Sequence, residues 1–325
     1  MVAQPTGFGR STGDPQVRLM TKVAHMYHEQ GIRQTEIADA LHISQAKVSR
    51  LLKRAGEVGI VKTIVVVSPG LQTELETQLE QRFGLLEAVV VDVVGEEAEI
   101  IAGLGSAGAG YLENTLTGGE RIGISPWSQT LLAVVDRLRP LRTAGAESVI
   151  QLLGGVGNSS VQVQANRLLD ELATRIGARP RFVPAPGLVG TAAMRRGLLK
   201  DSTMEDVTSE WASLTMALVG IGSLHPSPLL RQSGNAVEPV DESSLLSLGA
   251  VGDVCHRFFD ADGNLVRGQL DDRVVGISPA DYRGIPRRVG LAGGARKHAA
   301  VRAALRGGWV NVLLTDVETA RTLLS

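Results

Sequence analysis

Short apolar runs alternate with stretches of helical spacing along most of this chain. From residue 87 onward the runs are rich in Val, Ile and Leu, and they read EAVVVDVV, ERIGIS, ESVIQLLGG, RFVPAP, MALVGIG, RVVGIS, RRVGLAGG and WVNVLLTD. Strands of continuous apolar residues are typical of a mostly parallel sheet that helices cover on both faces. The sequence therefore predicts an open α/β domain, and such domains bind ligands at the carboxyl ends of their strands.

Helices are expected between these runs, over residues 98–116, from Trp127 onward, over 161–176, over 295–306 and at the end of the chain. Ahead of the first strand, residues 71–83 place leucines and a phenylalanine at helical spacing, with Glu on the other faces. Two interpretations of this segment stay open. It is either a surface helix that covers one core or a helix that mediates dimers.

The stretch TEIADALHISQAKVSRLLKRA, residues 35–55, has the pattern of two helices that pack across a tight turn. Ser44 is a good N-cap for a helix beginning at Gln45, and Ala38 is small enough to let that helix approach. His42 stands where such turns usually carry Gly, and a left-handed backbone is less easy for His. We predict a helix-turn-helix, with a leading helix within residues 14–30. A solvated helix hairpin is the competing interpretation.

The helix beginning at Gln45 would present polar and basic side chains that can reach base edges or phosphates in a major groove. We expect Gln45, Lys47, Ser49 and Arg50 to read bases. Lys22, Arg33, Lys53 and Arg54 would position the DNA backbone. The predicted DNA-binding residues are Arg33, Ser44, Gln45, Lys47, Ser49, Arg50, Lys53 and Arg54.

Charge is unevenly distributed, although the whole chain is nearly neutral with 33 basic and 34 acidic residues. Residues 1–63 hold nine Lys and Arg against five Asp and Glu. A basic N-terminal part on an acidic remainder is typical of a domain that meets phosphate while the rest stays away from it. After Ala55, GEVGIVKTIVVV has strand composition and predicts a small wing or exit strand before the break at Ser68-Pro69-Gly70.

The composition excludes several classes of protein. The single cysteine, Cys255, excludes a disulfide framework, and no apolar run is long enough to span a bilayer. The polar, Gly-rich start MVAQPTGFGRSTGD has no apolar signal core, which predicts a disordered tail on a cytoplasmic protein. No spacing of His, Cys or carboxylates indicates a metal site, and we expect no cofactor.

Three turns between a strand and a helix, in IGISPWSQT, QLLGGVG and LAGGARK, carry residues suited to an anion. In the first turn, after Ser125, free amides and hydroxyls at a helix N-terminus favour phosphate. In the second, glycines let the backbone approach a ligand closely, and in the third a lysine could lie within a turn of the same anion. Each turn alone is a weak signal, because α/β folds need Gly at such turns anyway.

These motifs together resemble a known family. The helix-turn-helix followed by IGISPWSQTL, QLLGGVG, QAN, PAPG, GAVGDVCHRFFDADG, RVVGIS and VGLAGGARKHAAVRAALRGGWVNVLLTD is similar to the SorC family of bacterial sugar-responsive transcriptional regulators. The resemblance covers nearly the whole chain in the same order. It implies an effector domain similar in fold to phosphosugar isomerases. That domain would bind a phosphorylated sugar or polyol and alter the hold of a homo-oligomer, usually a tetramer, on operator DNA.

The resemblance also places effector contacts by motif position. Relatives often have W-G-R-T or W-G-x-T after the IGIS strand, where this chain has P-W-S-Q-T, so we expect a phosphate loop without an Arg. The residue before Gly154 is basic in some relatives with doubly phosphorylated ligands, and here it is Leu153, which favours a singly phosphorylated effector. The predicted effector-binding residues are Ser125, Ser128, Gln129, Thr130, Gly154, Gly155, Gln164, Asp253 and Lys297.

The chemistry of these residues supports complementary roles. Hydroxyls and helix-start amides suit phosphate, Lys297 adds a point charge, and Asp253 and Gln164 suit sugar hydroxyls. Interpretations without any effector contact compete with each role. Asp253 would cap a helix, Lys297 would be a solvated helix residue, and Gln164 would face solvent. We expect His256 and Cys255 to be packing neighbours rather than ligands.

The predicted function is a DNA-binding regulator of carbohydrate metabolism that is not an enzyme. It comprises a tail, residues 1–13, a helix-turn-helix domain, residues 14–68, and an effector and oligomerisation domain, residues 69–325. The alternative is a sugar-phosphate isomerase or deaminase with a regulatory head. An isomerase needs a carboxylate or His base beside the substrate carbon, and Asp253 has no obvious second acid/base partner in the sequence. An oligomeric scaffold with neither activity is a third possibility.

Overall fold

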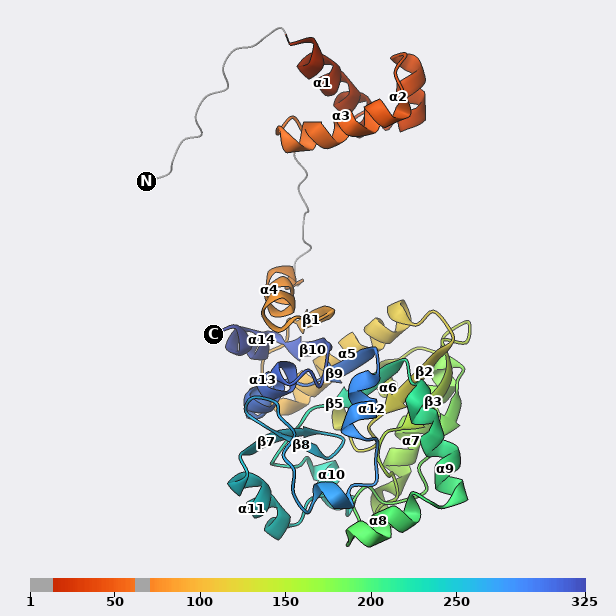
Figure 1. The fold of residues 1–325 in the computed structure, drawn as a ribbon, viewed down its shortest axis with the longest axis vertical. Helices are drawn as coiled ribbons and strands as arrows, with labels where there is room; N and C mark the ends of the chain where they lie inside the picture. The colour runs from red at the N-terminus through yellow and green to blue at the C-terminus, as the bar shows by residue number, and fades with distance from the viewer. Residues whose placement is uncertain (1–13, 62–70) are drawn as a thin grey trace. The chain divides into compact units, whose positions relative to one another are not determined.

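The computed structural model of the chain describes residues 14–61 and 71–325 (Figure 1). The chain divides into two compact units, Met1–Val67 and Ser68–Ser325. The predicted tail lies outside the described residues. So does half of the predicted wing strand GEVGIVKTIVVV, residues 62–67; in its described half, Gly56 and Glu57 belong to a helix and residues 58–61 form a turn and bend rather than a strand.

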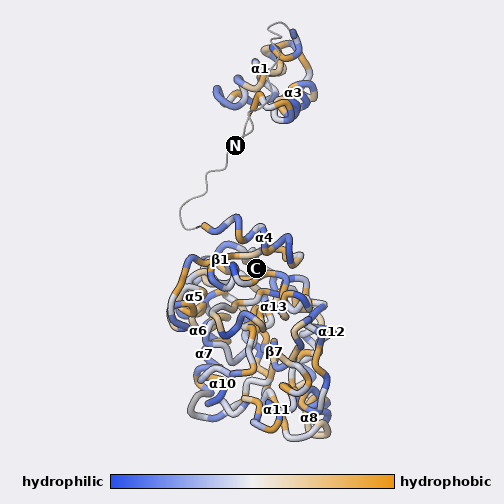
Figure 2. The backbone as a smooth tube through the Cα atoms, turned by 90° about the vertical axis from the view of Figure 1, so that its left-hand side faces the viewer, coloured by the Kyte–Doolittle hydropathy of each residue, from blue (hydrophilic) through white to orange (hydrophobic). Residues whose placement is uncertain are grey.

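Three helices make up the described part of the N-terminal unit: α1 (Pro15–His28), α2 (Gln34–Ala40) and α3 (Gln45–Glu57). Each helix buries one apolar face, and Figure 2 shows hydrophobic and hydrophilic positions interspersed along α1 and α3. The small core between them consists of Met20, Val23, Ala24, Ile37, Ala38, Val48, Leu51 and Ala55. These helices form the helix-turn-helix and the leading helix that the apolar spacing predicts.

The turn between α2 and α3 follows the sequence prediction closely. Ser44 caps α3, and its Oγ accepts from Lys47 N at 3.3 Å. The carbonyl of Ala38 accepts from Ile43 N at 2.9 Å, which closes the turn. His42 has a left-handed backbone with a φ of 52°. A non-Gly residue therefore occupies the strained position of the turn.

A parallel seven-stranded sheet organises residues 71–325, as the apolar runs predict. The strand order is β1-β10-β9-β5-β2-β3-β4, and every pairing is parallel. Parallel neighbours require crossover connections, which helices supply. The strands are β1 (Glu87–Val91), β2 (Glu120–Ile124), β3 (Ala146–Gln151), β4 (Arg179–Arg181), β5 (Met216–Gly220), β9 (Arg287–Leu291) and β10 (Val312–Asp316).

Helices cover both faces of this sheet (Figure 1). On one face α5, α6 and α7 share a core that includes Leu112, Leu131 and Leu168, and on the other face α13 and α14 contribute Val301 and Leu323. The helices are α4 (Thr73–Phe83), α5 (Glu97–Thr115), α6 (Gln129–Arg137), α7 (Ser159–Ile176), α8 (Ala192–Leu198), α9 (Ser202–Thr208), α10 (Pro228–Gln232), α11 (Pro239–Ser247), α12 (Pro279–Gly284), α13 (His298–Arg306) and α14 (Val317–Leu324). Short 3-10 helices are η1 (Ser209–Ser213), η2 (Asp271–Arg273) and η3 (Ala295–Lys297).

α4 covers the edge strand β1. Leu79 is fully buried in the core beneath the helix. The carboxylates of Glu76 and Glu80 accept from Val90 N at 2.9 Å and from Ala88 N at 3.0 Å. The two glutamates thus satisfy edge amides that would otherwise be open to another chain. α4 is therefore a surface helix over one core, and its part in dimers stays a prediction.

A second, antiparallel sheet is absent from the sequence prediction. It consists of β6 (Gly222–Ser223), β7 (Ala250–Val254) and β8 (Arg257–Asp260). The turn between β7 and β8 holds Cys255 and His256 at φ values of 52° and 58°. Two consecutive left-handed residues are the geometry of a tight hairpin turn, for which Asn or Gly is the usual sequence signal. The sequence carries neither residue here, so the hairpin has no local signature.

Four predicted elements differ in extent or kind. The run RVVGIS forms no strand of either sheet, and isolated bridges join Val274 to Leu188 and Gly276 to Leu153. The strand expected at RFVPAP lies earlier, as β4. The helix expected from Trp127 begins at Gln129, and the one expected over residues 295–306 is divided into η3 and α13.

β2 and β5 are neighbours in the sheet, but the chain leaves their carboxyl ends in opposite directions. From β2 it passes through α6 to β3, and from β5 it passes through the antiparallel sheet to β9. In open α/β sheets, ligands bind where the connections part in this way. The topology therefore directs attention to the turns that follow β2 and β5.

Replacing His42 with Gly should stabilise the N-terminal unit. A left-handed backbone at a non-Gly residue costs about 1–2 kcal/mol. Gly avoids this cost but loses more backbone entropy on folding, so we expect the free energy of unfolding to rise by a net value of about 0.5–1 kcal/mol. Hydrogen exchange of the α3 amides in the full-length protein measures this gain. His42→Val, which is β-branched, should lower protection. Equal protection in all three proteins would show that the turn stores no strain.

Candidate functional site

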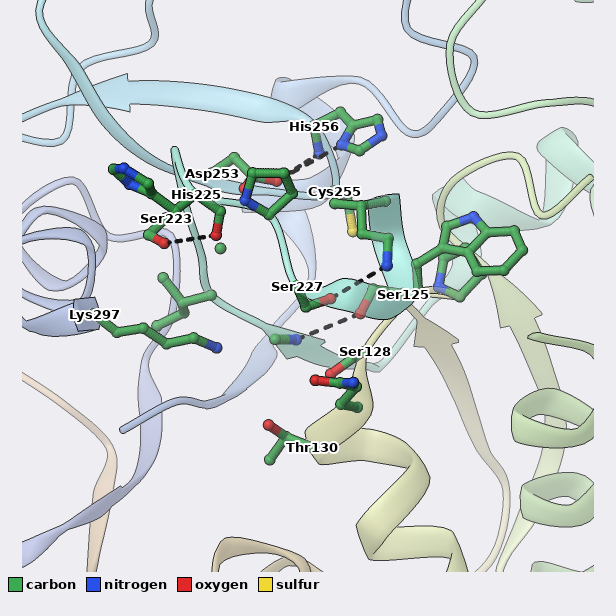
Figure 3. Close-up of a pocket in the computed structure, with 18 of the residues that line it drawn as sticks. Ser125, Ser128, Thr130, Ser223, His225, Ser227, Asp253, Cys255, His256 and Lys297 are labelled. Atoms are coloured by element: carbon green, nitrogen blue, oxygen red, sulfur yellow. Dashed lines mark hydrogen bonds and ion pairs between the residues drawn. The ribbon is translucent and has the colours of Figure 1, made fainter. Parts of the chain in front are cut away.

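A pocket of about 100 Å³ lies at the carboxyl edge of the sheet, where β2 and β5 end (Figure 3). The turns after β2 and β5 line it, together with the β7–β8 hairpin, the N-terminus of α5 and η3. Distant parts of the sequence therefore meet at the place that the topology indicates. Six predicted effector residues are among the lining: Ser125, Ser128, Gln129, Thr130, Asp253 and Lys297.

The start of α6 supplies free amides to this pocket. Ser128 caps the helix, and its Oγ accepts from Leu131 N at 3.2 Å. The first amides of a helix have no acceptor within it, which leaves those of Gln129 and Thr130 at the open end. The helix dipole and these donors favour an anion here.

Close contact between the ends of β2 and β5 holds this turn in place. Ser125 is buried, and its Oγ accepts from Gly220 N at 3.4 Å. A Cβ on Gly220 would lie 3.0 Å from Ser128 Oγ. Glycine at this position therefore allows the capping serine to sit directly against the neighbouring strand.

Lys297 extends from η3 into the pocket, across from Ser128 and Thr130 (Figure 3). Burial lowers the pKa of its ammonium below the usual value, and Arg296 acts in the same sense, whereas Glu97 and Asp253 oppose the shift. Lys297 is only partly exposed and lies in η3, so it is not a fully solvated residue of a helix face. A desolvated cation that faces free amides gains from any anion placed between them.

Asp253 projects into the pocket from β7 and does not cap a helix. Its Oδ2 accepts from His256 N at 3.0 Å, which stabilises the hairpin turn. Its Oδ1 lies so close to Gly222 that a Cβ there would be 2.0 Å away. Its side chain is only 13% exposed, so the carboxylate is a fixed acceptor in the wall of the pocket.

Cys255 and His256 pack in the hairpin, as expected, but they also line the pocket. The Nε2 of His256 is 2.9 Å from the carbonyl oxygen of Asn235, and its Nδ1 is 3.9 Å from Asp253 Oδ2. Burial, and then the charge of Asp253, raises the pKa of the Cys255 thiol far above its usual range. A thiol held protonated in this way is a poor nucleophile.

Several lining residues escape the sequence analysis. Arg296 and Glu97 form an ion pair of 3.4 Å at the rim, with both side chains about half exposed. Arg296 adjoins Lys297 in GGARK, which is a usable signal. The other missed polar residues lie after β5, where Ser-Pro at the start of α10 was the only local sign: Ser223, His225 and Ser227.

Three residues predicted to contact the effector, Gly154, Gly155 and Gln164, are not among those that line the pocket. A Cβ on Gly154 would be 2.3 Å from Pro186 O, and one on Gly155 would be 2.4 Å from the Gln151 amide. These glycines therefore permit close packing. They follow β3, which is not adjacent to β5 because β2 lies between the two strands. Gln164 is exposed on α7 and does not line the pocket.

The predicted DNA-contacting residues share the exposed surface of the N-terminal unit. On α3, Val48, Leu51 and Ala55 face the core, and the polar side chains point away from it. The hydroxyl of Ser44 already accepts a hydrogen bond from Lys47 N, so it is only partly available for a contact with DNA. The exposed residues are Arg33, Ser44, Gln45, Lys47, Ser49, Arg50, Lys53 and Arg54.

Within residues 14–61 and 71–325, no group of three or more His, Cys, Asp or Glu could hold a metal ion. In this described part of the chain, no helix has the length and apolar character needed to cross a membrane.

Known proteins match both units of the chain. Residues 68–325 match the family described as "Putative sugar-binding domain". The deoxyribonucleoside regulator of Bacillus subtilis is 34% identical over 310 residues, which cover 95% of this chain and 97% of that protein. The sorbitol operon regulator of Klebsiella pneumoniae is 34% identical over 314 residues, which cover 95% and 98%. This chain belongs to the SorC family of transcriptional regulators.

A solved structure supports the same assignment. The crystal structure of the full-length sorbitol operon regulator SorC from Klebsiella pneumoniae has a TM-score of 0.72 to this chain at 31% identity. The match covers 96% of this chain and all of that one, 100%. The resemblance in motifs and the predicted α/β fold of a SorC-family regulator are both confirmed.

Lys297→Met should stabilise the effector-free regulator, because it removes a desolvated cation. The pKa of the ammonium is lowered in the folded state, so the charged form costs stability below that pKa. The cost fades as the pH rises toward the ordinary lysine value of about 10.4. We expect a rise in Tm of ~2–4 °C at neutral pH that shrinks on alkalinisation. Thermal unfolding between neutral and alkaline pH measures it. The exposed Lys200→Met is the control, and a lower Tm for Lys297→Met would contradict the argument.

Proposed function

We propose that this regulator binds a phosphorylated sugar or polyol in the pocket at the carboxyl edge of its sheet, and that binding changes its hold on operator DNA. The observation that carries the proposal is the convergence of three features in one cavity. These are the free amides at the start of α6, the desolvated Lys297 ammonium and the Asp253 carboxylate. A phosphate suits the first two, and the hydroxyls of a sugar suit the carboxylate.

The charges around the pocket favour one phosphate on the effector rather than two. Among the lining residues, Lys297 and Arg296 are balanced by Glu97 and Asp253. A second phosphate would meet a carboxylate or the apolar Leu153, and like charges at short range repel strongly where water is excluded. A single phosphate at the free amides of α6 leaves the Asp253 carboxylate to accept from neutral hydroxyls.

The exposed side of α3 supports the DNA-reading role. Gln45, Lys47, Ser49 and Arg50 would read base edges, while Lys22, Arg33, Lys53 and Arg54 would hold the phosphate backbone. Most of the affinity would then come from phosphate contacts and would fall steeply with salt.

The coupling that we propose acts through a homo-oligomer, a tetramer in the cytoplasm. An effector that binds two quaternary arrangements with different affinities shifts the protein between them. The spacing of the DNA-binding units changes with the arrangement, and so does their ability to engage two half-sites together.

One observation favours the enzymatic alternative enough to test it. His256 lies beside Asp253, so the carboxylate has an acid/base neighbour that the sequence did not indicate. The ring is buried, however, and its Nε2 is already close to Asn235 O at 2.9 Å. A base for isomerisation must reach the substrate carbon, which this arrangement does not favour.

A thermal-shift panel of phosphorylated sugars and polyols, each with its unphosphorylated twin, tests the effector. We expect a phosphorylated member to raise Tm and its twin to leave Tm unchanged, because only the former fills the amide end. Equal responses within every pair would contradict the phosphate assignment. Product formation during the incubation would instead support the isomerase or deaminase.

Arg50→Ala should weaken operator binding by about 1–3 kcal/mol and relax base preference at one position, as expected for a lost base contact. A gel-shift titration at fixed salt measures both effects. Arg196→Ala, at an exposed arginine on α8, is the matched control and should bind as the wild type does. Unchanged binding by Arg50→Ala would remove this residue from the reading surface.

A further inference from the structure

A buried carboxylate from another part of the chain anchors the turn that carries Lys297. Asp316 ends β10 and caps α14, and it is only 1% exposed. Its Oδ2 accepts from Gly294 N at 2.8 Å and from Thr319 Oγ1 at 2.6 Å, while its Oδ1 accepts from Thr319 N at 2.8 Å. Thr319 Oγ1 accepts a second contact from Gly294 N at 3.1 Å. The two side chains together hold one backbone amide of the turn.

The shape of the turn depends on this anchor. Gly294 has a φ of 87° and a ψ of 151°, a conformation that is essentially restricted to glycine. A Cβ on Gly293 would lie 2.2 Å from Asp316 Oδ2, so this glycine lets the backbone rest directly on the carboxylate. The carbonyl of Gly294 then accepts from Lys297 N at 2.9 Å, which begins η3. The position of the Lys297 backbone therefore depends on the position of Gly294.

The anchor is chemically specific. A buried carboxylate is costly unless donors surround it. Here the donors are the amide of Gly294 and, at the start of α14, the amide and hydroxyl of Thr319. Both carboxylate oxygens are engaged as acceptors. A neutral amide side chain in the place of Asp316 would turn one acceptor into a donor, and that donor would face an N–H group, either that of Gly294 or that of Thr319.

We propose that Asp316 and Thr319 are positioning residues of the effector site, which act by fixing the Lys297 ammonium opposite the free amides of α6. Neither residue lines the pocket, so neither would touch the effector itself. The inference rests on the proposed function for the claim that Lys297 meets phosphate. The position of the ammonium can be measured without any ligand.

Thr319 offers the cleaner variants, because Asp316 also caps α14 and its loss could unfold the helix. Thr319 is fully buried. Thr319→Val keeps its shape and removes the hydroxyl, whereas Thr319→Ser keeps the hydroxyl and serves as the conservative control. If the hydroxyl positions the turn, Thr319→Val should misplace Lys297 and Thr319→Ser should leave its position unchanged.

The first measurement is the affinity of the full-length protein for inorganic phosphate, which is monitored through the NMR chemical shift of the phosphate signal. We expect Thr319→Val to weaken phosphate binding at least fivefold, and Thr319→Ser to stay within twofold of the wild type. Lys297→Met should weaken it at least as much as Thr319→Val. If Lys297→Met weakens binding but Thr319→Val and Thr319→Ser both bind phosphate as the wild type does, the positioning role is overturned.

The second measurement follows Lys297 directly. The chain has six lysines, at positions 22, 47, 53, 62, 200 and 297, and reductive methylation with labelled formaldehyde gives each a methyl signal. The Lys297 signal is identified by its loss in Lys297→Arg. We expect it to stand apart from the others in the wild type and in Thr319→Ser. In Thr319→Val it should move toward them, because the amine becomes more solvated. A Lys297 signal that is the same in Thr319→Val as in the wild type would contradict the inference.

The two measurements separate this inference from the proposed function. If Lys297→Met binds phosphate as the wild type does, the phosphate assignment fails, and the methyl signal alone decides whether Thr319 positions the lysine. If Lys297→Met weakens binding but Thr319→Val changes neither measurement, the proposed function stands and the positioning role is refuted.

Discussion

The parting of the chain at the adjacent carboxyl ends of β2 and β5 is the constraint on which the rest depends. Because β2 continues to β3 and β5 continues through the antiparallel sheet toward β9, the edge between them stays open to a ligand. The contact of Ser125 with Gly220 then brings the start of α6 against the end of β5. Free amides become available at this edge because a helix must begin there, so the fold itself supplies the anion-binding chemistry.

The turn that carries Lys297, residues 293–297 (the lysine turn), is held on its two sides by different contacts. On the pocket side, Lys297 lies in a setting that lowers its pKa, and Arg296 is drawn to Glu97. On the far side, the turn rests on Asp316, whose carboxylate is satisfied by hydrogen bonds. The Lys297 ammonium is therefore destabilised when no anion is bound, while hydrogen bonds to Asp316 hold the turn that carries it. Such an arrangement favours an anion over water, because the support prevents the lysine from relaxing toward solvent.

Much of the fold could be predicted because its signals are local. Continuous apolar strands indicate a parallel sheet, and the Ser44 cap with its apolar spacing indicates the helix-turn-helix. The β7–β8 hairpin could not be found in this way, since Cys255 and His256 adopt left-handed conformations that their types do not advertise. For the site, strand-end motifs and the family resemblance found six lining residues. Gly154 and Gly155 do not line the pocket. Glycine serves close packing and ligand approach alike, and the sequence alone does not distinguish the two uses.

The ion pair between Glu97 and Arg296 could not be predicted from the sequence, because the two residues lie on α5 and η3, nearly two hundred positions apart. Their ion pair at the rim changes how the pocket must be understood. With Asp253 it leaves the lining without an excess of positive charge, so attraction of an anion cannot come from net charge. It must come from directed amides and from one lysine whose hydration is already reduced. Discrimination between effectors then depends on where the phosphate sits relative to these donors, and therefore on the precision with which the lysine turn is held.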